Sequence, residues 1–145
     1  MANGVFNIAK GAVAEKFRDG AAAGLILLLK VNQTVTDMID HDTVEALLAG
    51  GNTEADFTNY ARKTGLTGSI TVDDTNDRVD VDVADQTWTA AGGASNNTLT
   101  KLIVAYQESA ADSGRIPLVH LDMAMTTDGS DVTAQINASG FFRAA

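Results

Sequence analysis

The clearest pattern in this chain is a strict alternation of apolar and polar positions around residues 69–83. Apolar β-branched residues alternate with polar neighbours on both sides of the turn-like polar segment 73–77. The apolar positions are Ile70, Val72, Val79, Val81 and Val83. A period of two is typical of strands that bury one face and leave the other in water. The pattern therefore predicts a hairpin whose wet face carries Asp80 and Asp82.

Other segments also predict strands. Val119–Met125 alternates in the same way and follows Pro117, which opens a strand because its missing N–H is tolerated there. The apolar runs Gly24–Val31 and Leu99–Tyr106 suit strands buried on both faces, and a buried helix is the alternative for Gly24–Val31. Shorter strands are expected at residues 5–9, 59–64, 87–90, 132–136 and 141–142.

The best helix signal begins at Asp42. The sequence Asp42-Thr43-Val44-Glu45 has the form of a capping box, in which the Asp42 side chain caps the helix and Glu45 reaches back to it. An apolar stripe over residues 44–48 follows, and Gly50-Gly51 ends the helix. A second short helical segment is predicted at residues 11–17.

Strands, turns and length together predict the fold class. Roughly seven or eight short strands separated by turn residues are typical of a sandwich or barrel. We expect a mainly β fold, an antiparallel β-sandwich or barrel-like domain with one or two short α-helices. Trp88 is expected in its core, and Thr127–Ser130 as a hairpin-type turn. The 145 residues fit one domain, residues 1–145.

Composition and charge exclude several classes of function. The formal net charge is -9 and the ten basic residues form no cluster, which argues against a nucleic-acid partner. The chain contains no cysteine, which excludes disulfides, thiolate metal sites and cysteine nucleophiles. The most apolar run, Leu25–Val31, is far shorter than the about 20 residues that span a bilayer, so no membrane partner is expected. The N-terminus also lacks the pattern of a secretory signal.

Two histidines could carry chemistry. His41 lies between Asp40 and Asp42, and as part of a small hydrolase it would act as a base for a nucleophile from elsewhere. We favour an exposed His41 that precedes a capped helix, because adjacency in sequence does not orient an imidazole. His120 and Asp122 share one face of a strand, but zinc needs three or four ligands. We interpret them as a solvent-facing or interface pair.

The aspartates between residues 73 and 85 could attract Ca²⁺. The segment lacks the glycine and glutamate positions of an EF-hand loop, so we interpret these residues as turn formers and a solvated face. No GxxxxGK or GxGxxG motif is present, which leaves no support for a nucleotide site. We therefore expect no catalytic, cofactor-binding or metal-binding residues, no cofactor, and a protein that is not an enzyme.

Several segments resemble a known family. Met1–Gly11 (MANGVFNIAKG), Asn59–Lys63 (NYARK), Asp73–Trp88 (DDTNDRVDVDVADQTW) and Phe141–Ala145 (FFRAA) are similar to small virion structural proteins of tailed bacteriophages, especially those of actinobacteria. The resemblance implies a capsid decoration or cement protein on the virion surface, bound to the major capsid protein. A head–tail connector or tail structural protein is the alternative, and a small hydrolase lies outside both.

A role in assembly predicts where the contacts lie. Two adjacent aromatic residues close to a chain end need burial, either in a neighbouring subunit or in the domain's own sheet. We therefore expect a homo-oligomer, most plausibly a trimer, with contacts that include Phe6, Ile8, Phe141, Phe142 and Arg143.

Overall fold

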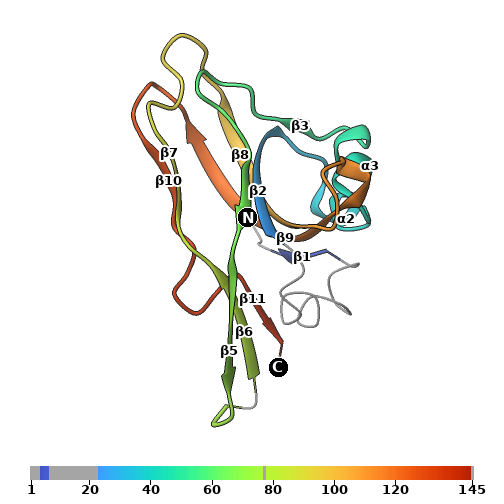
Figure 1. The fold of residues 1–145 in the computed structure, drawn as a ribbon. Helices are drawn as coiled ribbons and strands as arrows, with labels where there is room; N and C mark the ends of the chain where they lie inside the picture. The colour runs from blue at the N-terminus through green and yellow to red at the C-terminus, as the bar shows by residue number, and fades with distance from the viewer. Residues whose placement is uncertain (1–3, 7–22, 77, 145) are drawn as a thin grey trace.

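The computed structural model describes residues 4–6, 23–76 and 78–144, and its strand pairs are all antiparallel. The main sheet has the strand order β1 (Gly4–Val5), β9 (Arg115–Thr126), β8 (Thr98–Gln107), β2 (Ala23–Val31) and β3 (Thr53–Glu54), and β4 (Lys63–Leu66) also pairs with β2. A second sheet joins β11 (Phe142–Ala144), β6 (Arg78–Val83) and β5 (Gly68–Asp73), and a third joins β10 (Val132–Ala134) to β7 (Gln86–Trp88). The helices are α2 (Val35–Met38) and α3 (Val44–Ala49), with a 3₁₀-helix at Asp112–Gly114. The predicted mainly β, sandwich-like class with short helices is confirmed (Figure 1).

Strand β2 supplies side chains to both faces of the main sheet. Leu25, Leu27 and Leu29 enter one buried cluster, whereas Ile26 and Leu28 enter another. All five side chains are fully buried. Successive residues of a strand point to opposite faces, so a strand covered on both sides requires an apolar residue at every position. This double burial explains the continuous apolar run and excludes the helix alternative for Gly24–Val31.

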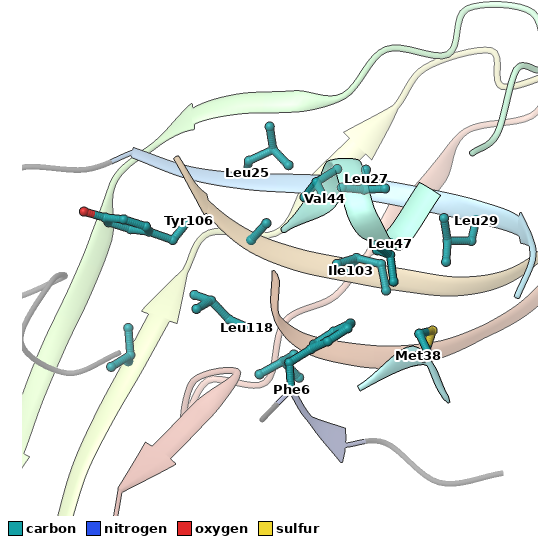
Figure 2. Close-up of a cluster of buried hydrophobic side chains, with 13 residues drawn as sticks. Phe6, Leu25, Leu27, Leu29, Met38, Val44, Leu47, Ile103, Tyr106 and Leu118 are labelled. Atoms are coloured by element: carbon teal, nitrogen blue, oxygen red, sulfur yellow. The ribbon is translucent and has the colours of Figure 1, made fainter. Parts of the chain in front are cut away.

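The first core lies between the main sheet and the two helices. Met38 of α2 and Val44 and Leu47 of α3 are fully buried against the sheet, as Figure 2 shows. Phe6, which follows β1, is fully buried in the same cluster. The two helices therefore cover one face of the main sheet, and Phe6, which follows the edge strand β1, contributes its ring to the same core.

The second core lies on the opposite face and is centred on Trp88. This side chain is 1% exposed and packs with Val83 and with Val132 from β10. Its indole Nε1 donates a hydrogen bond to the carbonyl oxygen of Ala61 at 2.8 Å. The ammonium group of Lys63 lies 5.2 Å from the ring centroid. The prediction that Trp88 belongs to the core is confirmed.

The hairpin of β5 and β6 projects from the rest of the molecule in Figure 1 and is extended on one side by β11. Its register places Ile70 opposite Val81 and Val72 opposite Val79, as the alternating pattern predicts. The face that carries the aspartates is not exposed to solvent throughout, however, because Asp80 is only 8% exposed. Arg143 Nε from β11 donates to Asp80 Oδ1 at 2.6 Å, and this pairing shields the carboxylate.

Several expected boundaries are wrong for identifiable reasons. The segment 59–64 is not one strand, since Asn59 has a φ of 68° and the chain turns there before β4 begins at Lys63. Pro117 does not open its strand but lies within β9, where the register against β8 shifts. Thr127–Ser130 joins β9 to β10, which pair with strands of different sheets, so it does not close a hairpin. The helix expected at 11–17 and residues 7–9 of the first strand lie outside the described residues.

The cap of α3 also differs from the prediction. Thr43, not Asp42, is the N-cap residue, and its hydroxyl accepts a hydrogen bond from the N–H of Ala46 at 3.1 Å. The cap is therefore one residue later than predicted, and no capping box forms, because the third residue after Thr43 is Ala46; the exposed Asp42 precedes the cap.

The two candidate caps can be separated by mutation. We expect Thr43→Ala to lower the free energy of unfolding by about 1 kcal/mol, because one N–H of the first turn loses its acceptor. The neighbouring change Asp42→Ala is expected to cost less than about 0.5 kcal/mol, as is usual for an exposed surface residue. Urea denaturation of both variants measures the difference, and the reverse order of effects would restore Asp42 as the cap.

Candidate interaction surface

The histidines that could carry chemistry occupy different environments. His41 is half-buried, with its Nε2 2.8 Å from the Gln33 side-chain oxygen, rather than exposed as expected. His120 is fully buried, so the solvent-facing or interface pair with Asp122 is wrong for the histidine. Asp122 instead pairs with Lys101 of β8, which lies opposite it in the sheet. Within residues 4–6, 23–76 and 78–144, no three His, Cys, Asp or Glu residues are grouped to hold a metal ion.

The aspartates that could attract Ca²⁺ accept hydrogen bonds from the chain itself. Asp73 accepts from the backbone N–H groups of Thr75 and Asn76 at 3.2 Å each, which forms the turn between β5 and β6. The hydrogen bond from the Asn76 side chain lowers the pKa of Asp73. Asp85 accepts from the N–H of Ile136 at 2.7 Å and thereby fixes the chain after β10. These carboxylates stabilise turns and connections.

A cluster of charged groups that the sequence did not reveal surrounds Arg62. Arg62 Nη2 donates to Glu54 at 2.6 Å and to Asp112 at 3.0 Å, and these partners raise the pKa of the guanidinium. The Tyr60 hydroxyl donates to Glu54 at 2.7 Å and accepts from the N–H of Leu28 at 3.1 Å, and burial raises the pKa of this phenol. The cluster ties the segment after β3 to β2 and to the 3₁₀-helix. Its members are distant in sequence, so no local pattern indicated it.

The residues expected at subunit contacts have separate locations. Phe6 is fully buried in the first core, Phe141 is half-buried against both cores, and Phe142 is half-buried against the first. Arg143 is exposed and pairs with Asp80 of its own chain. Ile8 lies outside the described residues. The segment from Asn137 to Arg143 lines a surface groove of about 330 Å³, so the C-terminal rings lie at the edge of the core, next to a hollow.

The hairpin of β5 and β6 exposes part of its apolar face. Ile70 and Val81 of this face pack against the first core, but Val72 is 64% exposed. Among the described residues, β5 pairs only with β6, so its other edge carries no strand. The alternating pattern placed Val72 on the buried face, and it could not show that the hairpin extends beyond the core that covers this face.

A second apolar surface lies between β9 and β10. A groove of about 250 Å³ is bounded by these two strands, and Met125 beside it is 38% exposed. The apolar residues that line the groove are Leu102, Leu121, Met123, Ala124, Met125, Ala134 and Ile136. Among the described residues, β1 pairs with β9 only at Val119 and His120. Along the groove, β9 therefore pairs with β8 on one edge and with no described strand on the other.

Comparisons with protein-family models, with curated proteins and with solved structures found no match. No helix among the described residues has the length and apolar character needed to cross a membrane. The molecule combines a net charge of -9, a projecting hairpin with an exposed apolar residue, and an apolar groove between β9 and β10.

Proposed function

We propose that this chain is a bacteriophage virion structural protein that decorates the capsid, binds the major capsid protein on the outer surface of the head, and acts as a homotrimer. The observation that carries the proposal is the projecting hairpin, whose apolar face continues past the core and leaves Val72 64% exposed. Val72 extends the apolar row of Ile70, Val79 and Val81 beyond the core, and contiguous apolar surface left exposed is typical of contact sites. The resemblance of four segments of the sequence to small virion proteins of tailed phages supports the same assignment.

In the proposed mechanism, the bound protein stabilises the capsid because it buries additional surface area where it contacts neighbouring capsid subunits. A specific interface buries about 1,200–2,000 Å² in total, and a few central apolar anchors supply most of its energy. Val72 provides an apolar contact, and the edge of β5 that no described strand pairs with provides a row of backbone groups for a neighbouring strand. With a net charge of -9, the chain requires a partner surface that is neutral or basic at the contact.

Copy number in purified virions tests the proposal. A decoration protein is expected at a molar ratio to the major capsid protein that is constant and of order one, measured by quantitative mass spectrometry. A copy number limited to a small ring would indicate a head–tail connector, the alternative assembly. Absence from the virion would contradict both assignments.

A pair of substitutions on β5 tests the contact itself. We expect Val72→Lys to reduce binding to heads about tenfold, which corresponds to about 1.4 kcal/mol, because it places a charge on the apolar contact face. Thr71→Lys adds the same charge to the exposed, opposite face of the same strand, where it lies opposite the carboxylate of Asp80, and is expected to bind normally. Binding to heads that lack the protein is measured by co-sedimentation. Equal loss in both variants, or in neither, would show that the apolar face of the hairpin is not the contact.

A further inference from the structure

His120 is an unusual core residue because its ring has no polar partner among the described residues. The side chain is fully buried in the middle of β9, opposite Gly4 of β1 on one side and Ile103 of β8 on the other. Within the part of the chain that the structure describes, neither Nδ1 nor Nε2 of the ring has a hydrogen-bond partner, and both are buried. A buried polar group without a partner costs free energy, and a charged one costs far more. The neutral ring is therefore tolerated here, whereas a protonated ring has no acceptor.

The first strand forms the cover over this ring. A Cβ built on Gly4 would lie 2.6 Å from Nε2 of His120, so the backbone of β1 lies directly against the imidazole. The Phe6 ring meets the imidazole edge-on, with 5.8 Å between the ring centroids. Beyond its two paired positions, this segment is attached by the hydrogen bond from the N–H of Phe6 to the carbonyl oxygen of Leu118, at 3.0 Å. The described part of this element, which lies against His120, is thus held by its backbone pairing with β9 and by the burial of the Phe6 ring.

The charged groups around the ring come from the strands beside it. Lys101 of β8 and Asp122 of β9 face it as an ion pair, and the described residues of β1 carry no titratable side chain. Burial lowers the pKa of His120 from its ordinary value of 6.5, Lys101 lowers it further, and Asp122 opposes them. An unfolded or uncovered ring therefore binds a proton at a higher pH than the covered ring does.

We propose that β1 is an acid-released strand: protonation of His120 is incompatible with the covered ring, so mild acid detaches Gly4–Phe6 from β9 while the rest of the sheet stays folded. The free energy that holds β1 on β9 has its full value above pH 6.5, the ordinary pKa of a histidine. It decreases as the pH falls below 6.5 toward the lowered pKa of the covered ring. Release hydrates the imidazole and uncovers the edge of β9 at Leu118–His120 together with the site of Phe6. This inference is independent of the proposed virion function.

Amide hydrogen exchange on the whole chain tests the proposal, and the two histidines of the sequence provide a matched pair of variants. We expect the protection factor of the Phe6 amide, corrected for the intrinsic exchange rate, to fall at least tenfold between pH 7 and pH 5. The protection factor of the Ile103 amide on β8 should not change. His41→Ala should behave as the unmodified protein does. His120→Leu, which cannot be protonated, should keep Phe6 protected at pH 5. Release that persists in His120→Leu, or protection that does not change with pH in the unmodified protein, would overturn the proposal.

A measurement on the unmodified protein applies whether or not His120→Leu folds. The imidazole ¹H resonance of His120 should titrate in the same pH range in which Phe6 loses protection, below pH 6.5. A ring that is protonated while Phe6 stays protected, or one that stays neutral while β1 leaves, would each contradict the mechanism. Gly4→Ala, which pushes a methyl group into the ring, should release the strand already at pH 7. Full protection of Phe6 in that variant would show that β1 does not lie on His120.

Discussion

Replacing Trp88 by alanine is expected to lower the free energy of unfolding by about 3–5 kcal/mol, which is typical of a large aromatic side chain removed from a core. Trp88 is 1% exposed and fills the second core between β2, β6 and β10. Its loss also leaves the carbonyl oxygen of Ala61 without a donor and Lys63 without its aromatic contact. Small domains have only about 5–15 kcal/mol of total stability, so the variant should be partly unfolded at moderate temperature.

The matched control is the adjacent residue of the same strand. Thr87 points away from the core, is exposed, and exchanges a hydrogen bond with Thr133 at 2.8 Å. We expect Thr87→Ala to cost no more than about 1 kcal/mol. Thermal unfolding followed by circular dichroism compares the variants, because the only tryptophan is lost in one of them. A Trp88 variant as stable as the Thr87 variant would show that the sheet of β7 and β10 is not anchored through this ring.

Periodicity alone was sufficient to predict the strands that form the body of the protein. Strand β2 and the stretch Leu102–Tyr106 of β8 are apolar at nearly every position because each face of the main sheet is covered by its own core. Strands β5 and β6 alternate because one of their faces packs inward. The period of the pattern therefore reports how many faces of a strand are covered. It does not report how far along the strand the cover extends, which is why the exposure of Val72 was not anticipated.

The errors concern polar residues whose partners are distant in sequence. Asp80 was expected in water, but Arg143, 63 residues later, pairs with it. His120 was expected at the surface, but the Gly4–Phe6 segment from the opposite end of the chain covers it. The burial of a polar side chain depends on which distant segment reaches it, and a local pattern contains no information on that. A glycine and an aromatic residue near the N-terminus were present, but nothing in the sequence paired them with His120.

The C-terminal segment combines a structural role with a proposed contact role, and deletion of residues 141–145 is expected to impair both. Phe141 donates its N–H to the carbonyl oxygen of Val81 at 3.0 Å, and β11 then pairs with β6 from Phe142 onward. The close contact of the chain with Val81 requires glycine at position 140. The φ of Gly140 is 85°, and a Cβ there would lie 2.3 Å from the carbonyl oxygen of Val81. The loss of two half-buried rings should lower the free energy of unfolding by roughly 2–3 kcal/mol.

Head binding by this deletion variant separates the two roles, provided that it is measured well below the melting temperature of the variant. We expect occupancy on heads to fall there, because both aromatic rings and the groove beside them are lost. Arg143→Ala is the matched control: it keeps both rings and removes one partner of the largely buried Asp80, which still has Arg78 Nε at 3.3 Å, so the variant should stay folded at a cost of about 1–2 kcal/mol and bind heads normally. Unchanged occupancy of a folded deletion variant would refute the contact role of Phe141 and Phe142 and assign them to the core of their own chain. An unchanged melting temperature would instead refute the pairing of β11 with β6.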